Sequence, residues 1–183
     1  GLVKGDRALL KESFREAKQI SKNTNNIISN LFKEVRLLRD DEIKEEKRYG
    51  KIIASVKDIA ETLKTFNNRC FEHIDNNHAA PGKEQSEDLN ILSKSLDEFF
   101  EIAKQIIQKP GENSKKIIED KNQEIFKTVQ KLDKNQVQRI KKNTNSSRSS
   151  LLFLEILSDT GNITSRTEIL AASICSNLKS ITK

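Results

Sequence analysis

The chain has 183 residues, of which 33% are charged and 34% are hydrophobic, and its formal net charge is +6. This length allows one sizeable core, or two small helical units that share one. No apolar stretch approaches the ~20 residues that a membrane-spanning helix needs, and no signal peptide is recognisable. The basic residues are interleaved with 27 acids instead of gathering on one face, so we expect no nucleic acid among the partners.

Apolar residues recur at spacings of three and four along nearly the whole chain, which predicts long α-helices and no strands. Short polar joints at Asp40, Pro81, Pro110 and Asn145 place successive helices side by side. We therefore expect an all-α, antiparallel bundle of about five long helices. Their expected bounds are Asp6 to about Asp40, Asp41 to Asn76, Lys83 to Lys109, Asn113 to about Asn143, and Ser147 to about Ser180.

The first helix has a bundle-type apolar seam, softened by polar positions in its middle. Its members alternate spacings of three and four: Leu10, Phe14, Ala17, Ser21, Thr24, Ile28, Leu31, Val35 and Leu38.

The second helix is expected to end near Asn76, because Asn76 and Asn77 tolerate left-handed backbone and Pro81 cannot continue a helix. His73 and His78 lie in this turn. A spacing of five does not align two histidines on one helix face. We therefore interpret both as cap and turn residues, with metal binding as the less favoured alternative.

The fourth helix has a thinner apolar stripe on a lysine-rich background. Its members are Ile117, Ile118, Ile125, Val129, Leu132, Val137 and Ile140. The basic end of this helix, RIKKN, is interpreted as a solvated terminus favoured by the helix macrodipole, in preference to a phosphate site.

The fifth helix opens with the densest apolar cluster of the chain, and polar residues are set into it. At about 100° per residue, Glu155, Asp159, Asn162 and Arg166 fall on one line of this helix, with Arg148 behind them. We name these five residues the polar stripe. A helix with this pattern is covered by neighbours on most sides and shows one polar line to solvent or to a ligand.

Several kinds of chemistry lack a motif in this sequence. There is no glycine-rich phosphate loop, no cysteine pair at zinc spacing and no nucleophile with a plausible base. Cys70 and Cys175 continue apolar stripes, and we expect buried, reduced thiols, as in a reducing compartment. We predict that the chain is not an enzyme. A ligand- or metal-responsive regulatory bundle and a plain helical interaction module are the classes that remain.

Two stretches resemble a known family. YGKIIASVKDIAETLKTFNNRCFEHIDNNH, followed by KEQSEDLNIL, is similar to the PhoU-like domain at the C-terminal, cytoplasmic end of bacterial sodium/phosphate cotransporters. SLLFLEILSDTGNI is similar to the closing motif helix of phosphate-uptake regulators. The likeness covers most of the chain, from about Lys11 to Ile181.

The resemblance implies a single domain of two related helical units, which we place at residues 1–80 and 83–183. The family has six helices, so its first helix would precede Gly1, and we expect the domain to be excised from a longer membrane protein. Without that helix, part of the seam on the first helix stays uncovered. We therefore also expect a homodimer through the first helix.

In the family, each unit has an acidic E/D-x-x-x-D motif that binds metal. The second motif falls on Glu155 and Asp159 and is intact. The first falls on Lys57 and Glu61, so a cation replaces its leading acid, and Asp58 is turned about 100° away.

Two interpretations of the second motif stay open. Two carboxylates at i and i+4 repel each other unless a positive group compensates. We favour an ion-pair and hydrogen-bond network of Glu155 and Asp159 with Arg148, Arg166 or Lys57, and no cofactor. The alternative is one weakly bound divalent ion at Glu155 and Asp159, with Glu61 or Asp58 as the third ligand.

The function implied by the resemblance is a non-catalytic regulatory domain that modulates phosphate uptake by a sodium/phosphate cotransporter. It would lie on the cytoplasmic side of the inner membrane, and its partner would be the membrane-embedded transporter domain of the same chain. One alternative is a free-standing phosphate-uptake regulator that binds a kinase or an uptake complex. Another is a ligand-free helical scaffold.

Overall fold

The computed structural model describes residues 1–38 and 43–175, and every long element in these ranges is an α-helix. No strand occurs within the described ranges, so the all-α prediction is confirmed. None of the described helices is both long enough and apolar enough to cross a membrane. The elements are a short 3-10 turn η1 (Leu2–Lys4) and the helices α1 (Arg7–Val35), α2 (Ile43–Asp75), α3 (Lys83–Gln108), α4 (Ser114–Lys141) and α5 (Ser147–Cys175).

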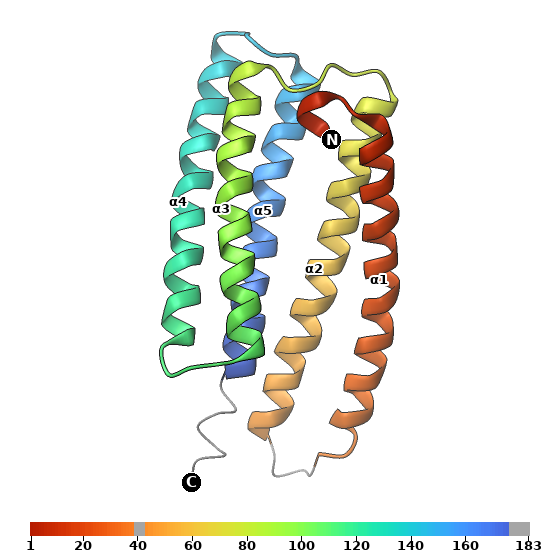
Figure 1. The fold of residues 1–183 in the computed structure, drawn as a ribbon, viewed down its shortest axis with the longest axis vertical. Helices are drawn as coiled ribbons and strands as arrows, with labels where there is room; N and C mark the ends of the chain where they lie inside the picture. The colour runs from red at the N-terminus through yellow and green to blue at the C-terminus, as the bar shows by residue number, and fades with distance from the viewer. Residues whose placement is uncertain (39–42, 176–183) are drawn as a thin grey trace.

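The helices run up and down in turn and form two parts (Figure 1). α1 and α2 make a hairpin, and α3, α4 and α5 make a three-helix group. α2 packs against α5, so this pair of helices joins the hairpin to the group.

Turn residues end the helices close to the predicted positions. Asn77, two residues after the end of α2, has a left-handed backbone with φ of 58°. At the start of α5, the backbone N–H of Ser149 donates to Ser146 Oγ at 3.1 Å, as a capping serine does. The predicted joint at Asp40 and the predicted end of the fifth helix at Ser180 lie outside the described residues.

Two clusters of buried apolar side chains fill the bundle. The first joins the two parts and contains Leu10, Cys70, Leu92, Leu132, Leu152, Phe153, Ile156 and Leu157. The second belongs to the three-helix group and contains Phe99, Ala103, Ile106, Ile118, Ile125 and Ala171. Most of the buried apolar surface of the described residues therefore lies in α3, α4 and α5.

The hairpin buries mainly small side chains. On α1, Ala17, Ser21 and Thr24 are buried, and on α2, Ser55 and Ala60. Three apolar side chains on a neighbouring line of α1 are about half exposed: Leu9 at 46%, Ile20 at 46% and Ile27 at 51%. Large apolar groups of the hairpin thus remain in contact with solvent.

The seam predicted on the first helix faces α2 in part. The Phe14 ring stacks on the Phe71 ring with 6.2 Å between their centroids, while Ile28 is half-buried. The seam is therefore only partly covered within one chain.

The two cysteines are free and differ in burial. Cys70 is 2% exposed, and this burial raises the pKa of its thiol to about 12. Cys175 is only half-buried, so the prediction of a fully buried thiol is confirmed for Cys70 and is wrong for Cys175.

Candidate functional site

The polar stripe of α5 lies along the line where α5 packs against α2. Its members contact polar side chains on α2 or on the turn that follows α2, and we name this set of contacts the polar ladder. The contacts are Arg166–Asp58 at 2.9 Å, Asn162–Thr62 at 3.0 Å, Asp159–Arg69 at 2.9 Å, Glu155–Arg69 at 3.6 Å and Arg148–His78 at 2.7 Å.

The spacing of the polar ladder follows from antiparallel packing. Asp58 and Arg69 are eleven positions apart on α2, and their partners Arg166 and Glu155 are eleven positions apart on α5. Eleven residues make about three helical turns, so contacts at this spacing return to the same face of each helix. The polar ladder therefore matches one register of α2 against α5.

Arg69 reaches from α2 to both carboxylates of the acidic motif. Its Nη2 lies 2.9 Å from Asp159 Oδ2, and its Nη1 lies 3.6 Å from Glu155 Oε2. The Asp159 side chain is 14% exposed, and its desolvation raises the pKa of the carboxyl group, a shift that the Arg69 guanidinium opposes. Arg69 thus supplies the positive charge that two carboxylates one turn apart require.

The cation predicted for this pair was therefore the wrong one. Arg148 and Arg166 have other partners in the polar ladder, and Lys57 acts electrostatically on Glu61. The acidic pair is held by Arg69, on the facing helix. A line of polar residues on α2 at spacings of four and seven, matched to the polar stripe, was the signal that could have identified it.

Glu61 and Asp58, the predicted third ligands for a metal, do not join the acidic pair. Glu61 faces α1, where its Oε1 accepts a hydrogen bond from Ser21 Oγ at 2.9 Å, and this bond lowers the pKa of the carboxyl group. Asp58 is paired with Arg166. Among the described residues, no three His, Cys, Asp or Glu side chains gather in a way that could hold a metal ion.

The two histidines lie together at the end of α2. The His73 ring is buried, and its Nε2 lies 2.9 Å from the carbonyl oxygen of Ala79. The His78 ring is 5.1 Å from that of His73, centroid to centroid, and accepts a hydrogen bond from Arg148. Burial and the neighbouring guanidinium lower the pKa of His78. These contacts are those of turn and cap residues, as the sequence indicates.

A second polar centre, which the sequence did not reveal, is buried among α3, α4 and α5. Gln85 Nε2 donates to Gln136 Oε1 at 3.1 Å, and Ser149 Oγ donates to Gln85 Oε1 at 2.9 Å. Arg139 donates to Gln136 Oε1 at 2.9 Å and to Asp88 Oδ2 at 2.8 Å. The first turns of α3, the last turns of α4 and the start of α5 are thereby joined by polar contacts.

The side chains of this centre show that two predictions about the fourth helix are wrong. Val137 and Ile140, placed on its apolar stripe, are 39% and 45% exposed, whereas Gln136 is fully buried. Arg139, the first residue of the predicted solvated terminus, is only 6% exposed. Near its end, α4 therefore turns its polar side toward α3 and α5. The polar residues Gln85 and Asp88, which precede Leu92 at helical spacing, were the available signal.

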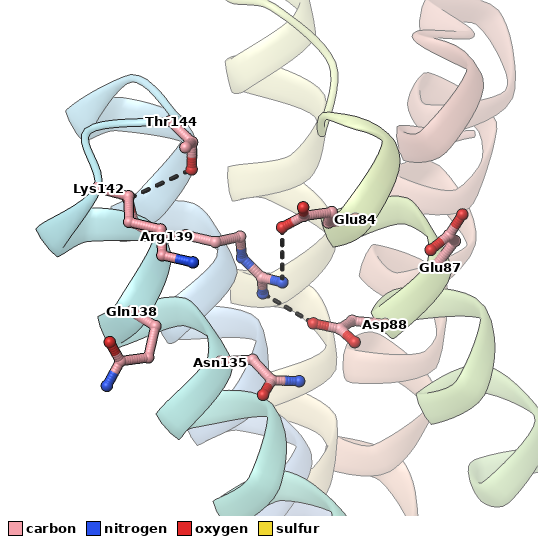
Figure 2. Close-up of a pocket in the computed structure, with 8 residues that line it drawn as sticks. All are labelled: Glu84, Glu87, Asp88, Asn135, Gln138, Arg139, Lys142 and Thr144. Atoms are coloured by element: carbon pink, nitrogen blue, oxygen red, sulfur yellow. Dashed lines mark hydrogen bonds and ion pairs between the residues drawn. The ribbon is translucent and has the colours of Figure 1, made fainter.

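A cleft of about 330 Å³ opens above this centre, between α3 and α4 (Figure 2). The ion pair of Arg139 and Asp88 is part of its lining. Its lining residues are Glu84, Glu87, Asp88, Asn135, Gln138, Arg139, Lys142 and Thr144.

Comparison of this chain with models of known protein families, with curated proteins and with solved structures finds no match in any of the three. The resemblance to PhoU-like domains therefore rests on the two sequence stretches quoted above.

Proposed function

We propose that this chain acts by binding, as a non-catalytic helical regulatory module. The polar ladder is the observation that carries this proposal. Glu155 and Asp159, the residues of the most distinctive motif, contact Arg69 across the interface of two helices. Contacts of this kind fix the register of packed helices, and the interface they hold can respond to a partner or a ligand.

The more specific form of this proposal is a cytoplasmic regulatory domain that modulates phosphate uptake by a sodium/phosphate cotransporter. Its support is the resemblance, whose stretches correspond to α2, the start of α3 and the first half of α5. These include both helices of the polar ladder. The partner would be the membrane-embedded transporter domain of the same chain, at the cytoplasmic side of the inner membrane.

Sodium-dependent uptake of radioactive phosphate tests this role. Cells producing the natural protein are compared with cells in which residues 1–183 are deleted, at equal transporter abundance in the membrane. We expect the deletion to change the uptake rate. Rescue by residues 1–183 supplied as a separate chain would favour the free-standing regulator. Unchanged uptake would contradict both the cotransporter domain and the free-standing regulator of phosphate uptake.

The exposed apolar side chains of α1 favour a second candidate, a ligand-free scaffold that self-associates through α1. Under this proposal, light scattering gives the mass of a dimer, and Ile20→Lys restores the monomer. Ile117→Lys is the matched control, because Ile117 is equally exposed, at 46%, but lies on α4. A wild-type monomer at high protein concentration contradicts the scaffold.

A further inference from the structure

The cleft between α3 and α4 has walls of opposite charge (Figure 2). Glu84, Glu87 and Asp88 come from the first turns of α3. Arg139 and Lys142 come from the end of α4, and Arg139 extends across the cleft toward α3. A molecule in this cleft therefore meets carboxylates on one side and cations on the other.

Arg139 is held in one orientation. Its Nε donates to Gln136 at 2.9 Å, and its Nη2 donates to Asp88 at 2.8 Å. The guanidinium also lies over the Phe153 ring, 5.1 Å from the ring centroid. A charged group that is only 6% exposed and fixed on three sides needs little further ordering when a ligand binds.

One amino group of this guanidinium lacks a hydrogen bond to a described side chain. A guanidinium has five N–H donors. The carboxylate nearest to Nη1 of Arg139 is that of Glu84, and its Oε2 lies 4.0 Å away, which is beyond hydrogen-bond distance. The side chain of Arg139, more than nine-tenths buried, thus has N–H groups that can donate hydrogen bonds to an oxygen atom of a ligand in the cleft.

The charges restrict the kind of ligand. A simple anion at Nη1 would be repelled by Glu84, and a simple cation at Glu84 would be repelled by Arg139. A molecule that carries a carboxylate and an ammonium group close together satisfies both sides. We infer that this cleft binds a small zwitterion of the free α-amino-acid class, with its carboxylate on Arg139 and Lys142 and its ammonium group on Glu84.

This ligand site goes beyond the proposed regulatory role and does not depend on it. Calorimetric titration of the purified chain provides the test, with glycine, L-alanine and L-serine as probes. Acetate, methylammonium and inorganic phosphate are the matched single-charge ligands. We expect saturable binding of at least one amino acid and at least about tenfold weaker binding of each single-charge ligand, as loss of one charged contact predicts.

Two exposed lining residues allow variants that fold. Glu84→Gln and Lys142→Gln should each weaken amino-acid binding about tenfold. Glu101→Gln on α3 and Lys115→Gln on α4 are the controls, because they remove the same charges from surface ion pairs outside the cleft. Circular dichroism verifies the fold of each variant. The inference is overturned if no amino acid binds the wild-type chain, if phosphate or acetate binds equally well, or if the cleft variants match the controls.

Discussion

The three-helix group and the α1–α2 hairpin consist of helices of similar length, but they bury different side chains. The group encloses Phe99 and Ile118, both 0% exposed, whereas the hairpin encloses Ser21 and Ser55. Buried apolar area is the main favourable contribution to folding, and small polar side chains supply little of it. The free energy of unfolding should therefore come chiefly from the group. The polar ladder and one shared apolar cluster hold the hairpin to it.

The largest difference is expected between two phenylalanines. Phe99→Ala, at the centre of the group, should lower the free energy of unfolding by about 3–5 kcal/mol, because it leaves a cavity. Phe32→Ala, on the hairpin at 49% exposure, should change it by less than about 0.5 kcal/mol. Urea unfolding followed by circular dichroism measures both. Similar losses at the two sites would show that the hairpin is packed as tightly as the group.

The buried polar centre of the group should be nearly as sensitive. Asp88→Ala leaves the Arg139 guanidinium buried without its closest carboxylate. This should lower the free energy of unfolding by about 3 kcal/mol, because the carboxylate of Glu84, 4.0 Å from Arg139, offsets part of the loss. Asp97→Ala, an exposed aspartate on the same helix, is the control and should be almost neutral. The same unfolding experiment applies. A neutral Asp88→Ala variant would mean that Arg139 is not effectively buried in solution.

Local helix propensity should affect both regions equally. Gly50 in the hairpin and Gly161 in the group lie inside helices, and a Cβ at either position meets no atom within 4 Å. Gly50→Ala and Gly161→Ala should therefore each raise the free energy of unfolding by about 0.5–1 kcal/mol. Thermal melting of the two variants measures this. A loss of stability in only one of them would reveal a helix distortion in that region.

The smallest expected effect is a difference in pH dependence between two carboxylates. The pKa of Asp159 is raised by desolvation, so its contribution to stability is present below the ordinary pKa and is lost as the pH rises through the raised value. The pKa of Glu61 is lowered by Ser21, so its contribution is present above the ordinary pKa and is lost as the pH falls. Unfolding of Asp159→Asn and Glu61→Gln between pH 3 and pH 7 is compared with the wild type.

The two variants should differ from the wild type in opposite directions. The advantage of the wild type over Asp159→Asn should shrink with rising pH, and its advantage over Glu61→Gln should grow. Parallel curves would contradict the different environments of the two carboxylates.

The helices could be predicted because their apolar spacing and their turn residues are local signals. Asn77 and Pro81, which follow the end of α2, are such signals. Partners across helices could not be predicted in the same way. Arg69 meets Asp159 only in one register of α2 against α5, and that register depends on packing along both helices.

The burial of polar side chains is the second feature that the apolar pattern of the sequence does not predict. Apolar periodicity assigns Val137 to the core and Arg139 to solvent, yet the structure reverses both. Arg139 can be buried because Asp88, Gln136 and the Phe153 ring together satisfy its charge and donors. Partners supplied by α3 and α5 are invisible to a pattern measured along α4 alone.

Arg69 contacts both Glu155 and Asp159 and can compensate their charges, so we expect this pair to need no metal ion. The most direct test is the melting temperature of the wild-type chain with and without manganese, zinc or iron, together with elemental analysis of the purified protein. We expect no stoichiometric metal and an unchanged melting temperature. A stoichiometric metal that stabilises the wild type, and is lost together with that stabilisation in Asp159→Asn, would contradict it.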